Sequence, residues 1–395
     1  MDFSLNEEQI AWQMKARKFA EEEIKPVSLK RDQIANPEET IDWDLIKKGS
    51  KLGFRTAVVA KDRGGHGIDF VTQALVMAEL AKADSATSKT FSQCWKWSHL
   101  IAAACTEDQR ERFLVPFLAD DTFVLGSGQT EANSGSDNRL PPPDDLKAGT
   151  RLRAELDGDH WVLNGEKQFI ANGNIAKAFF LTVRTDPSVH FTKGCTLLLV
   201  SGDTPGFSRG KVYNKSGWRF YQNGEMVFQD ARVPVANQIG ETNGALAKSE
   251  GESSGDMFGD LELAANGLGI CDAACEQAIA LANNHISGGK PLKDQQLIQL
   301  KIGRMKMLTE SLRTYVMLVA WEHDQKIHST HAGLVMNLST DTIQEVAELN
   351  MDIHDYAGAP MDRLADKLAR DTFIWSHLAG DSVQRLKVAG RVIRQ

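Results

Sequence analysis

The sequence lacks several features that would define a class of protein at once. It holds no run of about 18 consecutive apolar residues, which is the length that a membrane-spanning helix requires. Its start, MDFSLNEEQ, is polar and acidic, so it has neither the basic nor the apolar segment of a signal peptide. Basic residues are not in excess, since 45 Lys and Arg stand against 53 Asp and Glu, which argues against nucleic-acid binding. We therefore predict a cytoplasmic protein with no membrane span and no nucleic-acid partner.

Cysteine is also scarce, with five residues in the whole chain. A small and odd number indicates reduced thiols in a cytosol rather than a disulfide framework. Cys271 and Cys275 are four apart and could share a helix face, but two buried thiols are favoured over a metal or redox pair. His99, His354 and His377 show no metal-ligand spacing. The sequence therefore predicts no metal site.

The chain is long enough for two or three domains, and its composition is that of a globular protein. It has 395 residues, of which 42% are hydrophobic and 25% charged. The first region, 1–118, has helical periodicity, and Ser4 with Glu7 three residues later predicts a capping box at its first helix. Further helices are expected over 43–53, 70–83 and 89–105.

The second region, 119–235, changes character to short strand-like runs. They cover residues 123–129, 149–158, 160–170, 177–186 and 194–202. The pairs Asn164-Gly165, Asn172-Gly173 and Pro205-Gly206 are typical turn residues. This pattern predicts an all-β domain, either a small barrel or a sandwich.

The third region, 245–395, is helical again. Apolar residues recur every three or four positions over 263–284 and 296–325, and two further helices are expected across 345–393. The fold class predicted is therefore α+β and multidomain. It has an N-terminal all-α domain (1–118), a middle all-β domain (119–235) and a C-terminal all-α domain (245–395).

Several motifs occur within this order. TEANSGSD (130–137) opens the β region, and GDHWVLNGEKQFIANG (158–173) follows as a hairpin. The remaining motifs are PGF (205–207), SGWR (216–219), MVFQDARVP (226–234), RLADKLARD (363–371) and AGDSVQR (379–385). Together they resemble the acyl-CoA dehydrogenase family over nearly the whole chain. The resemblance implies a three-domain subunit whose C-terminal domain is a four-helix bundle.

The resemblance also implies a flavin site around TEANSGSD, whose small residues let a planar ring approach the main chain. Thr130 would contact the flavin of FAD, Gln129 would supply a main-chain group, and Ser127 would belong to the same cofactor-binding strand. Ser136 would contact the acyl-CoA substrate or the cofactor tail. Phe169 could stack on a ring face.

Other cofactor positions depart from the family pattern. Ala171 stands where the family has a threonine, so it offers no hydroxyl to the flavin. Gln296 matches a residue that a neighbouring subunit lends to the ADP half of FAD. Around it, His285, Gly288 and Gly289 replace an Arg-x-x-Phe-Gly motif.

The other half of the ADP site departs in charge. Asp352, Asp355 and Tyr356 replace a Gln-x-x-Gly-Gly motif, and Asp381 replaces a threonine. Carboxylates near a diphosphate repel it. This chain is therefore expected to contribute poorly to the binding of the ADP half of FAD in a neighbouring subunit.

The catalytic base departs too. In the family a carboxylate removes the substrate α-proton while a hydride leaves the β-carbon for the flavin. The usual glutamate position holds Ala379, which cannot accept a proton. Some members place the glutamate on the first long C-terminal helix, where this chain has Gly259 followed by Asp260. Asp260 and Glu262 are therefore the substitute candidates, with Glu262 expected on roughly the same helix face as Gly259.

Three functions follow from this set of matches and losses. The first is FAD-dependent α,β-dehydrogenation of an acyl-CoA, or of an acyl-carrier-protein thioester, in lipid or carboxylic acid catabolism. The second is a catalytically silent or FAD-poor subunit of a hetero-oligomeric acyl-CoA dehydrogenase. The third is a flavin-dependent oxygenase or elimination enzyme on the same fold. The resemblance implies a homo- or hetero-tetramer that passes electrons to an electron-transfer flavoprotein, and the acyl group stays open.

Overall fold

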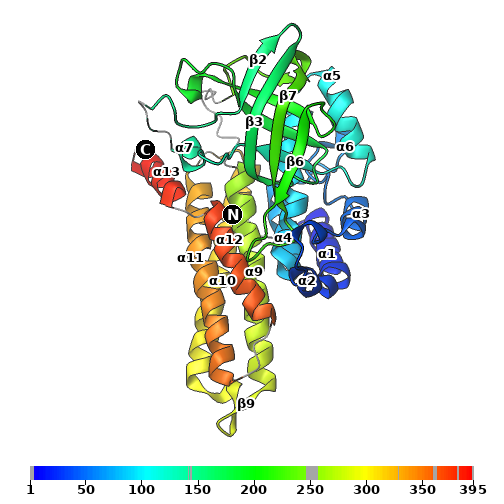
Figure 1. Cartoon of the computed structure of the whole chain (residues 1–395). Coiled ribbons are helices and arrows are strands. Elements are labelled where there is room, and N and C mark those ends of the chain that lie inside the picture. The colour runs from blue at the N-terminus through cyan, green and yellow to red at the C-terminus, as the bar shows by residue number, and fades with distance from the viewer. Residues whose placement is uncertain are drawn as a thin grey trace.

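The computed structural model describes residues 4–140, 142, 145–245, 257–327, 329–358, 363–379 and 382–393. Figure 1 shows a strand-rich part at one end of the molecule and a column of long helices that extends away from it. A group of shorter helices lies beside the place where the two meet. The order along the chain is helices, then strands, then helices.

The helices before the sheet form the first group. They are α1 (Glu7–Phe19), α2 (Lys25–Asp32), α3 (Trp43–Lys51), α4 (Phe70–Ala104), α5 (Glu107–Gln109) and α6 (Val115–Ala119). The capping box predicted at Ser4 and Glu7 is wrong. Asn6 caps α1 instead. Its side-chain oxygen accepts the Gln9 N–H, and the Gln9 side-chain oxygen accepts the Asn6 N–H. Asparagine is as good a cap as serine, so sequence spacing alone does not choose between them.

Helix α4 joins two helices that the sequence predicts separately. The chain leaves helical geometry within α4 at Asp84, whose φ and ψ are −162° and 111°. The Asp84 carboxylate accepts the Thr87 N–H at 2.7 Å, so it caps the second half of the helix. Ser28 of α2 also donates to it, at 2.7 Å. The break therefore sits in a buried polar environment rather than at a surface loop.

The strands form one mixed sheet with the order β6-β7-β3-β2-β4-β5-β8, and β1 pairs with β4 in parallel. The strands are β1 (Leu125–Gly128), β2 (Arg153–Asp157), β3 (His160–Ala171), β4 (Ala178–Arg184), β5 (Cys195–Ser201), β6 (Phe207–Val212), β7 (Asn223–Pro234) and β8 (Gln238–Ile239). The five predicted strand runs are present. Strand β7, which pairs with β3 along most of its length, is not among them.

One predicted turn is wrong, because Asn164-Gly165 lies inside strand β3. The register of β3 against β7 shifts between Leu163 and Gly165, so the pair forms a β-bulge. Asn164 and Asp230 exchange hydrogen bonds across the two strands, at 2.9 and 3.0 Å. The turns at Asn172-Gly173 and Pro205-Gly206 are present as predicted.

The long helices after the sheet form the column in Figure 1. They are α9 (Glu262–Asn284), α10 (Gln296–Asp324), α11 (His331–Ala357), α12 (Arg363–Ala379) and α13 (Ser382–Ile393). The region 345–393 therefore holds parts of three helices rather than two. Between α9 and α10 the short strands β9 (Ile286–Ser287) and β10 (Lys290–Pro291) form a hairpin at the far tip of the column.

A buried ionic cluster ties the three groups of elements together. Lys367 of α12 lies 3.0 Å from Asp84 of α4 and 2.6 Å from Asp371. The second oxygen of Asp371 accepts the main-chain N–H of Trp218, in the loop before β7, at 2.7 Å. A buried charge cluster of this kind needs all its partners, because removing one leaves an uncompensated charge in the core. It therefore fixes how the helices sit against the sheet.

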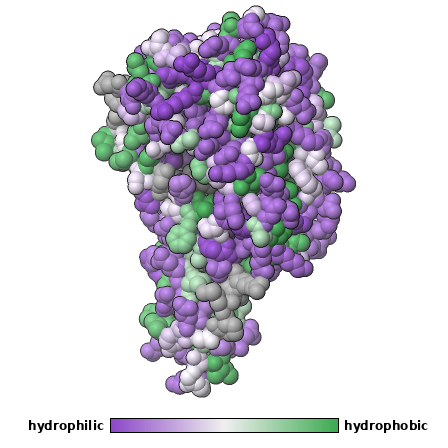
Figure 2. Space-filling model, in the orientation of Figure 1, coloured by the Kyte–Doolittle hydropathy of each residue, from purple (hydrophilic) through white to green (hydrophobic). Residues whose placement is uncertain are grey.

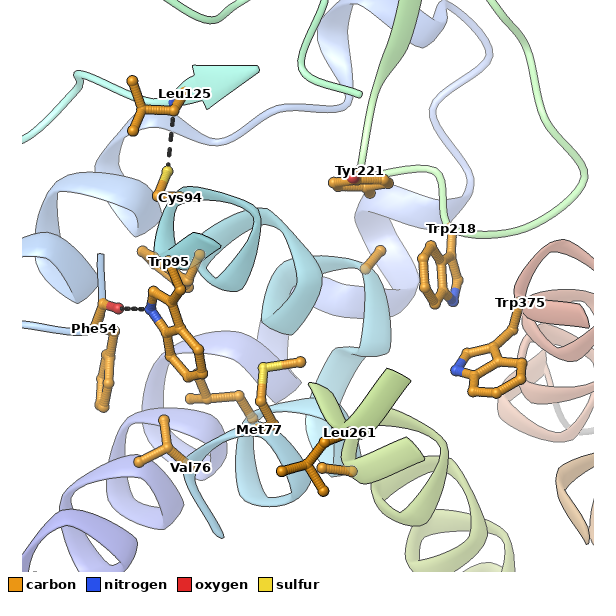
Figure 3. Close-up of a cluster of buried hydrophobic side chains, with 14 of the residues drawn as sticks. Phe54, Val76, Met77, Cys94, Trp95, Leu125, Trp218, Tyr221, Leu261 and Trp375 are labelled. Atoms are coloured by element: carbon orange, nitrogen blue, oxygen red, sulfur yellow. Dashed lines mark hydrogen bonds between the residues drawn. The ribbon is translucent and has the colours of Figure 1, made fainter. Parts of the chain in front are cut away.

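Large aromatic side chains fill the core where α4 meets the sheet and the column. Figure 3 shows Trp95 donating its indole N–H to the Phe54 carbonyl, at 2.7 Å, and Trp218 lying near Trp375. Cys94 accepts the Leu125 N–H in the same view. All five cysteines are free and buried, which confirms the burial predicted for Cys271 and Cys275, and burial raises the pKa of Cys94 to about 11. They therefore act as packing residues.

The visible face of the molecule is mostly polar, as expected when apolar side chains are buried in the core. Figure 2 shows mostly polar side chains over the broad part, with scattered apolar ones that continue down the narrow column. None of the described helices is long and apolar enough to cross a membrane. Among the described residues no group of three His, Cys, Asp or Glu side chains could hold a metal ion.

Candidate functional site

The loop after β1 is anchored by a buried ion pair. Lys167 of β3 lies 2.7 Å from Glu131 and donates a second bond to the Gln129 carbonyl at 3.1 Å. Glu131 also accepts the N–H groups of Arg151 and Leu152, at 2.8 and 2.9 Å. Burial lowers the pKa of Lys167, and the Glu131 carboxylate opposes that effect. The pair therefore sets where the loop leaves the sheet.

The carboxylate of Asp137 closes the same loop. It accepts N–H groups from Gly135, Asn138 and Gly149, at 2.7, 3.1 and 2.7 Å, and the Ser134 hydroxyl at 3.2 Å. Burial raises the pKa of Asp137, but these bonds outweigh it, so the pKa lies below its ordinary range. Asp137 therefore has a structural role in the motif, which is to hold the main chain of the loop.

Close packing against β4 explains the glycines of β1. A Cβ on Gly126 would lie 2.8 Å from the Phe179 ring, and one on Gly128 would lie 2.6 Å from Leu181. Neither position has room for a side chain. The small residues at this point are therefore required by the sheet itself, whether or not a ring approaches them.

The predicted cofactor residues of the loop lie along one path. Ser127 lies in β1 and is half-buried, Gln129 is exposed, and Thr130 is half-buried. Ser136 is exposed at the start of the short helix α7 (Ser136–Arg139). The Gln168 N–H donates to the Thr130 carbonyl at 2.9 Å, so the loop touches β3 next to Phe169. The structure thus brings Thr130 and Phe169 together.

Phe169 lies in a second β-bulge of β3, between Lys167 and Ile170. Its φ is 56°, in the left-handed region that few side chains adopt. Its ring stacks on Tyr213, with centroids 4.0 Å apart and planes at 24°, yet the residue is 53% exposed. One face of the ring is therefore covered and the other is open, which suits a planar ligand. Ala171, two residues on, is half-buried and pairs with Asn223.

Glu262 is the first residue of α9 and is buried. Its Oε1 lies 2.6 Å from Lys89 of α4 and also accepts a bond from Ser92. Burial raises the pKa of Glu262, and the contacts with Lys89 and Ser92 only partly oppose this. A carboxylate with a raised pKa is better matched to proton transfer near neutral pH than an ordinary one.

Asp260 is buried on the π-helical turn Met257–Leu261 that precedes α9. The Gln384 side chain of α13 donates to it at 3.3 Å, and Arg139 of α7 donates to Gln384 at 3.1 Å. This chain of contacts links the start of α9 to the loop after β1. A Cβ on Gly259 would meet no other atom within 4 Å, so there is space beside it. Ala379 ends α12.

Gln296 and the glycines expected at the ADP half of FAD lie at the far tip of the helical column. Gln296 begins α10 next to the β9–β10 hairpin, which Figure 1 places at the tip far from the sheet. Gly288 and Gly289 form the hairpin turn with φ of 60° and 79°, the geometry of a two-residue turn. Within one chain, Gln296 is therefore remote from the loop after β1 (residues 129–138), hereafter the flavin loop after its expected ligand.

The remaining substitutions near the hairpin have partners within the chain. His285 contacts the Ala357 carbonyl at 2.9 Å through Nε2, and Asp352 pairs with Lys301 at 2.7 Å. Asp355 is exposed, as is Tyr356. Lys301 thus offsets part of the acidic charge predicted there. Asp381 lies outside the described residues.

Sequence reasoning missed the roles of several residues of the site. They are Lys89 and Ser92, which contact Glu262, and Arg139 and Gln384, which lead to Asp260. Each comes from an element distant in sequence from its partner, so spacing along the chain cannot reveal the contact. Gln384 does lie within the motif AGDSVQR, but the motif does not show that its side chain reaches Asp260.

Comparison with known proteins decides the family. The model for "Acyl-CoA dehydrogenase, N-terminal domain" matches residues 6–121, that for the middle domain matches 126–231, and that for the C-terminal domain matches 258–393. The chain belongs to the acyl-CoA dehydrogenase family. The predictions of family and fold class are confirmed, as is the class of flavin oxidoreductase at the level of the family.

Individual acyl-CoA dehydrogenases match over most or all of their length. The chain is 30% identical to the short-chain specific acyl-CoA dehydrogenase of Clostridium acetobutylicum, over 100% of each. It is 30% identical to the mitochondrial isobutyryl-CoA dehydrogenase of Dictyostelium discoideum, over 98% of this chain and 89% of that protein. The butyryl-CoA dehydrogenase structure from Megasphaera elsdenii superposes with a TM-score of 0.89 at 29% identity, over 100% of each chain.

Proposed function

We propose that this protein catalyses the FAD-dependent α,β-dehydrogenation of an acyl-CoA thioester as one subunit of an oligomer. The observation that carries the proposal is the convergence of three elements that are distant in sequence. The Gln168 N–H joins Thr130 to the Phe169 bulge, and Arg139 with Gln384 joins the same loop to Asp260 at the start of α9. A ring-stacking residue, a polar loop and buried carboxylates therefore share one region.

FAD, when bound, supplies the acceptor for the hydride that leaves the substrate β-carbon. The chain's own residues do the rest. Phe169 would stack on the flavin ring, Thr130 and the Gln129 main chain would bond the flavin, and Ser127 and Ser136 would line the path of the cofactor and substrate. The bulge and the Glu131–Lys167 pair hold these groups before any ligand arrives, so little ordering is left to binding.

Glu262 is the base we assign first, and Asp260 is the second candidate. A buried carboxylate holds a proton well because its charged form is poorly solvated. Lys89 and Ser92 contact one oxygen of Glu262, and this fixes the orientation of the carboxylate. Removal of the α-proton by Glu262 and departure of the β-hydride together leave the enoyl thioester.

Flavin bleaching by substrate tests this assignment. Purified protein is mixed anaerobically with a panel of acyl-CoA thioesters, and the loss of visible flavin absorbance is followed in the parent, Glu262→Gln and Asp260→Asn. A lost general base lowers the rate by about 10²–10⁴-fold. Glu322→Gln is the control, because Glu322 is equally buried but pairs with Ser329 and His331 at the far end of α10. Parent rates in both Glu262→Gln and Asp260→Asn would defeat the base assignment.

A second candidate function is supported by the hairpin tip. His285 stands where the family has an arginine, and Asp355 adds exposed acidic charge. A chain that contributes only weak contacts to the ADP half of a neighbour's FAD is expected in a hetero-oligomer. The sister subunit would then contribute the stronger contacts. The flavin-to-protein ratio and the native mass, measured on the chain expressed alone and with a sister subunit, distinguish the two. A full complement of flavin in a homo-oligomer would count against the hetero-oligomer.

The partners follow from the proposed chemistry. Electrons that reach the flavin must leave it, and an electron-transfer flavoprotein is the acceptor we propose. The separation of Gln296 from the flavin loop within one chain supports a tetramer in which subunits complete one another's sites. Reoxidation of substrate-reduced protein by electron-transfer flavoprotein, followed at the flavin band, tests the acceptor.

A further inference from the structure

The main chain at Phe169 is held in a conformation that it would not adopt by itself. A phenylalanine at a φ of 56° is disfavoured relative to extended geometry, because its Cβ crowds the main chain. The bulge at this point turns the side chain out of the alternation of β3. Such a conformation persists only where neighbouring groups hold it.

Asn223, the first residue of β7, is the group that holds it. Its Nδ2 donates to the Phe169 carbonyl at 2.8 Å, and its own carbonyl accepts the Tyr213 N–H at 2.9 Å. Tyr213 in turn covers one face of the Phe169 ring. Asn223 therefore bonds the main chain of Phe169, and Tyr213 packs against the Phe169 ring.

The orientation of the Asn223 amide depends on Lys215. The ammonium of Lys215 donates to Asn223 Oδ1 and to the Tyr221 carbonyl, each at 2.5 Å. An ammonium has donors and no acceptor, so only the amide oxygen of Asn223 can face it. The amide nitrogen must then point to Phe169. Without a donor at position 215 only the Phe169 carbonyl orients the amide, and the amide oxygen loses its partner, so the bond to Phe169 is weakened.

Lys215 occupies this place at a cost in stability. Burial lowers the pKa of Lys215 to about 7, which Asp371 opposes and Arg219 adds to. Both groups that the ammonium contacts are uncharged oxygens. A lysine that served only for packing would be replaced by an apolar side chain without this cost.

We propose that Lys215 is a positioning residue of the flavin site, which acts through the Asn223 amide to hold Phe169 in its bulge with the open ring face toward the flavin. This inference rests on the proposed function, because it assigns Phe169 to flavin stacking. Lys215 itself touches neither flavin nor substrate in this assignment.

The test measures FAD binding rather than turnover. Apoprotein of the parent, Lys215→Met, Lys215→Arg and Phe169→Ala is titrated with FAD, and the dissociation constant and the visible circular dichroism of the bound flavin are recorded. Loss of one held hydrogen bond weakens binding about tenfold. We expect that loss in Lys215→Met, with a dichroism band changed as in Phe169→Ala. Lys215→Arg keeps a donor-only head group and stays within about twofold of the parent.

The double variant Lys215→Met/Phe169→Ala decides whether the two residues act together. If Lys215 works through Phe169, the double variant binds FAD no worse than Phe169→Ala alone. Additive losses, or parent affinity in Lys215→Met, would overturn the inference. Should Lys215→Met fail to fold by far-ultraviolet dichroism, Asn223→Asp replaces it, since a carboxylate keeps the Lys215 contact but cannot donate to Phe169.

Failure of the proposed function gives a different result. A parent oligomer that takes up no FAD, alone or with a sister subunit, rejects the flavin assignment and the positioning role with it. A parent that binds FAD as tightly as Lys215→Met rejects the positioning role alone.

Discussion

The flavin loop and the hairpin tip face the same expected cofactor but keep the family pattern to very different degrees. At the loop, Glu131 and Asp137 are present and bonded to the main chain. At the tip, His285 and Asp355 stand in place of the expected arginine and small residues. In Figure 1 the hairpin lies at the tip of the column, far from α7, which follows the loop where the sheet meets the column.

The physical roles of these residues explain the difference. Glu131 is buried and Asp137 is half-buried, and both bond the main chain of the loop, so folding alone would retain them. At the tip Asp355 is exposed, whereas His285 is half-buried and contacts the Ala357 carbonyl. Asp355 is therefore the tip residue least constrained by folding, and its charge says most about cofactor binding.

The largest expected effect is on the loop. Glu131→Gln leaves Lys167 charged in a site where its side chain is 0% exposed, which destabilises the protein by about 3 kcal/mol. Urea unfolding followed by fluorescence measures the loss. Asp157→Asn removes an exposed pair with Arg232 in the same sheet and should leave the midpoint unchanged. Equal midpoints for Glu131→Gln and the parent would show that the loop does not depend on this pair.

The next effect compares Asp137 of the loop with Asp324 of the column, since both accept main-chain N–H groups. Asp324 accepts those of Phe70 and Val71, at 2.7 and 3.0 Å, but burial raises its pKa to about 6. The native state then binds a proton more tightly than the unfolded chain, so this contribution is present at low pH and is lost as pH rises from about 4 to 6.

Relative to Asp324→Asn, the parent should therefore lose about 1–2 kcal/mol of stability between pH 4 and pH 7. This is less than the pKa shift alone would give, because the carboxylate is partly exposed. Urea midpoints at several pH values measure the difference between the two proteins. A difference that does not change with pH would contradict the raised pKa of Asp324.

A smaller effect is expected where the loop side itself departs from the family. Ala171→Thr returns a hydroxyl beside Phe169 at a half-buried strand position that suits a β-branched residue. One added hydrogen bond should tighten FAD binding about two- to tenfold. Ala171→Val, which has the shape without the hydroxyl, is the matched control for a fluorescence titration. Equal tightening by valine would assign the gain to packing.

The smallest effect is expected at the tip. His285→Arg restores a cation at the half-buried position before the hairpin, and a solvent-screened cation near a diphosphate is worth about a threefold gain in FAD affinity. The gain should disappear at high salt because exposed charges are screened. Gly288 is a poor site for a similar repair, since its φ of 60° strains any side chain. No gain in a homo-oligomer would mean that the tip does not meet the cofactor.

Local sequence signals predicted the elements well where one physical effect dominates. Five strand runs and the long helices follow from apolar periodicity. Ser4 failed as a cap because Asn6 competes for the same role two residues away. Asn164-Gly165 failed as a turn because its cross-strand bonds with Asp230 hold it within β3. In both cases tertiary or neighbouring contacts chose between residues of similar propensity.

The candidate site divides in the same way. Thr130, Phe169 and the base candidates near Gly259 could be named from motifs, and the structure places them within linked elements. The roles of Lys89 and Gln384 could not be named, because their contacts with Glu262 and Asp260 cross a long stretch of chain. Lys215 contacts Asn223 nearby in sequence, but its link to Phe169 depends on the long-range bond from Asn223. The expectation that Glu262 shares a regular helix face with Gly259 also misses the π-helical turn that separates them.

The sequence by itself determined the family, the order of helical and strand regions and the losses at Ala379 and His285, since these depend on residue identity along the chain. Tertiary structure alone decided the pairing of Lys89 with Glu262, the bulge that exposes Phe169 and the distance between Gln296 and the flavin loop. The physical reason is that burial and long-range hydrogen bonds set the charge and direction of a side chain. Neither can be read from its neighbours in sequence.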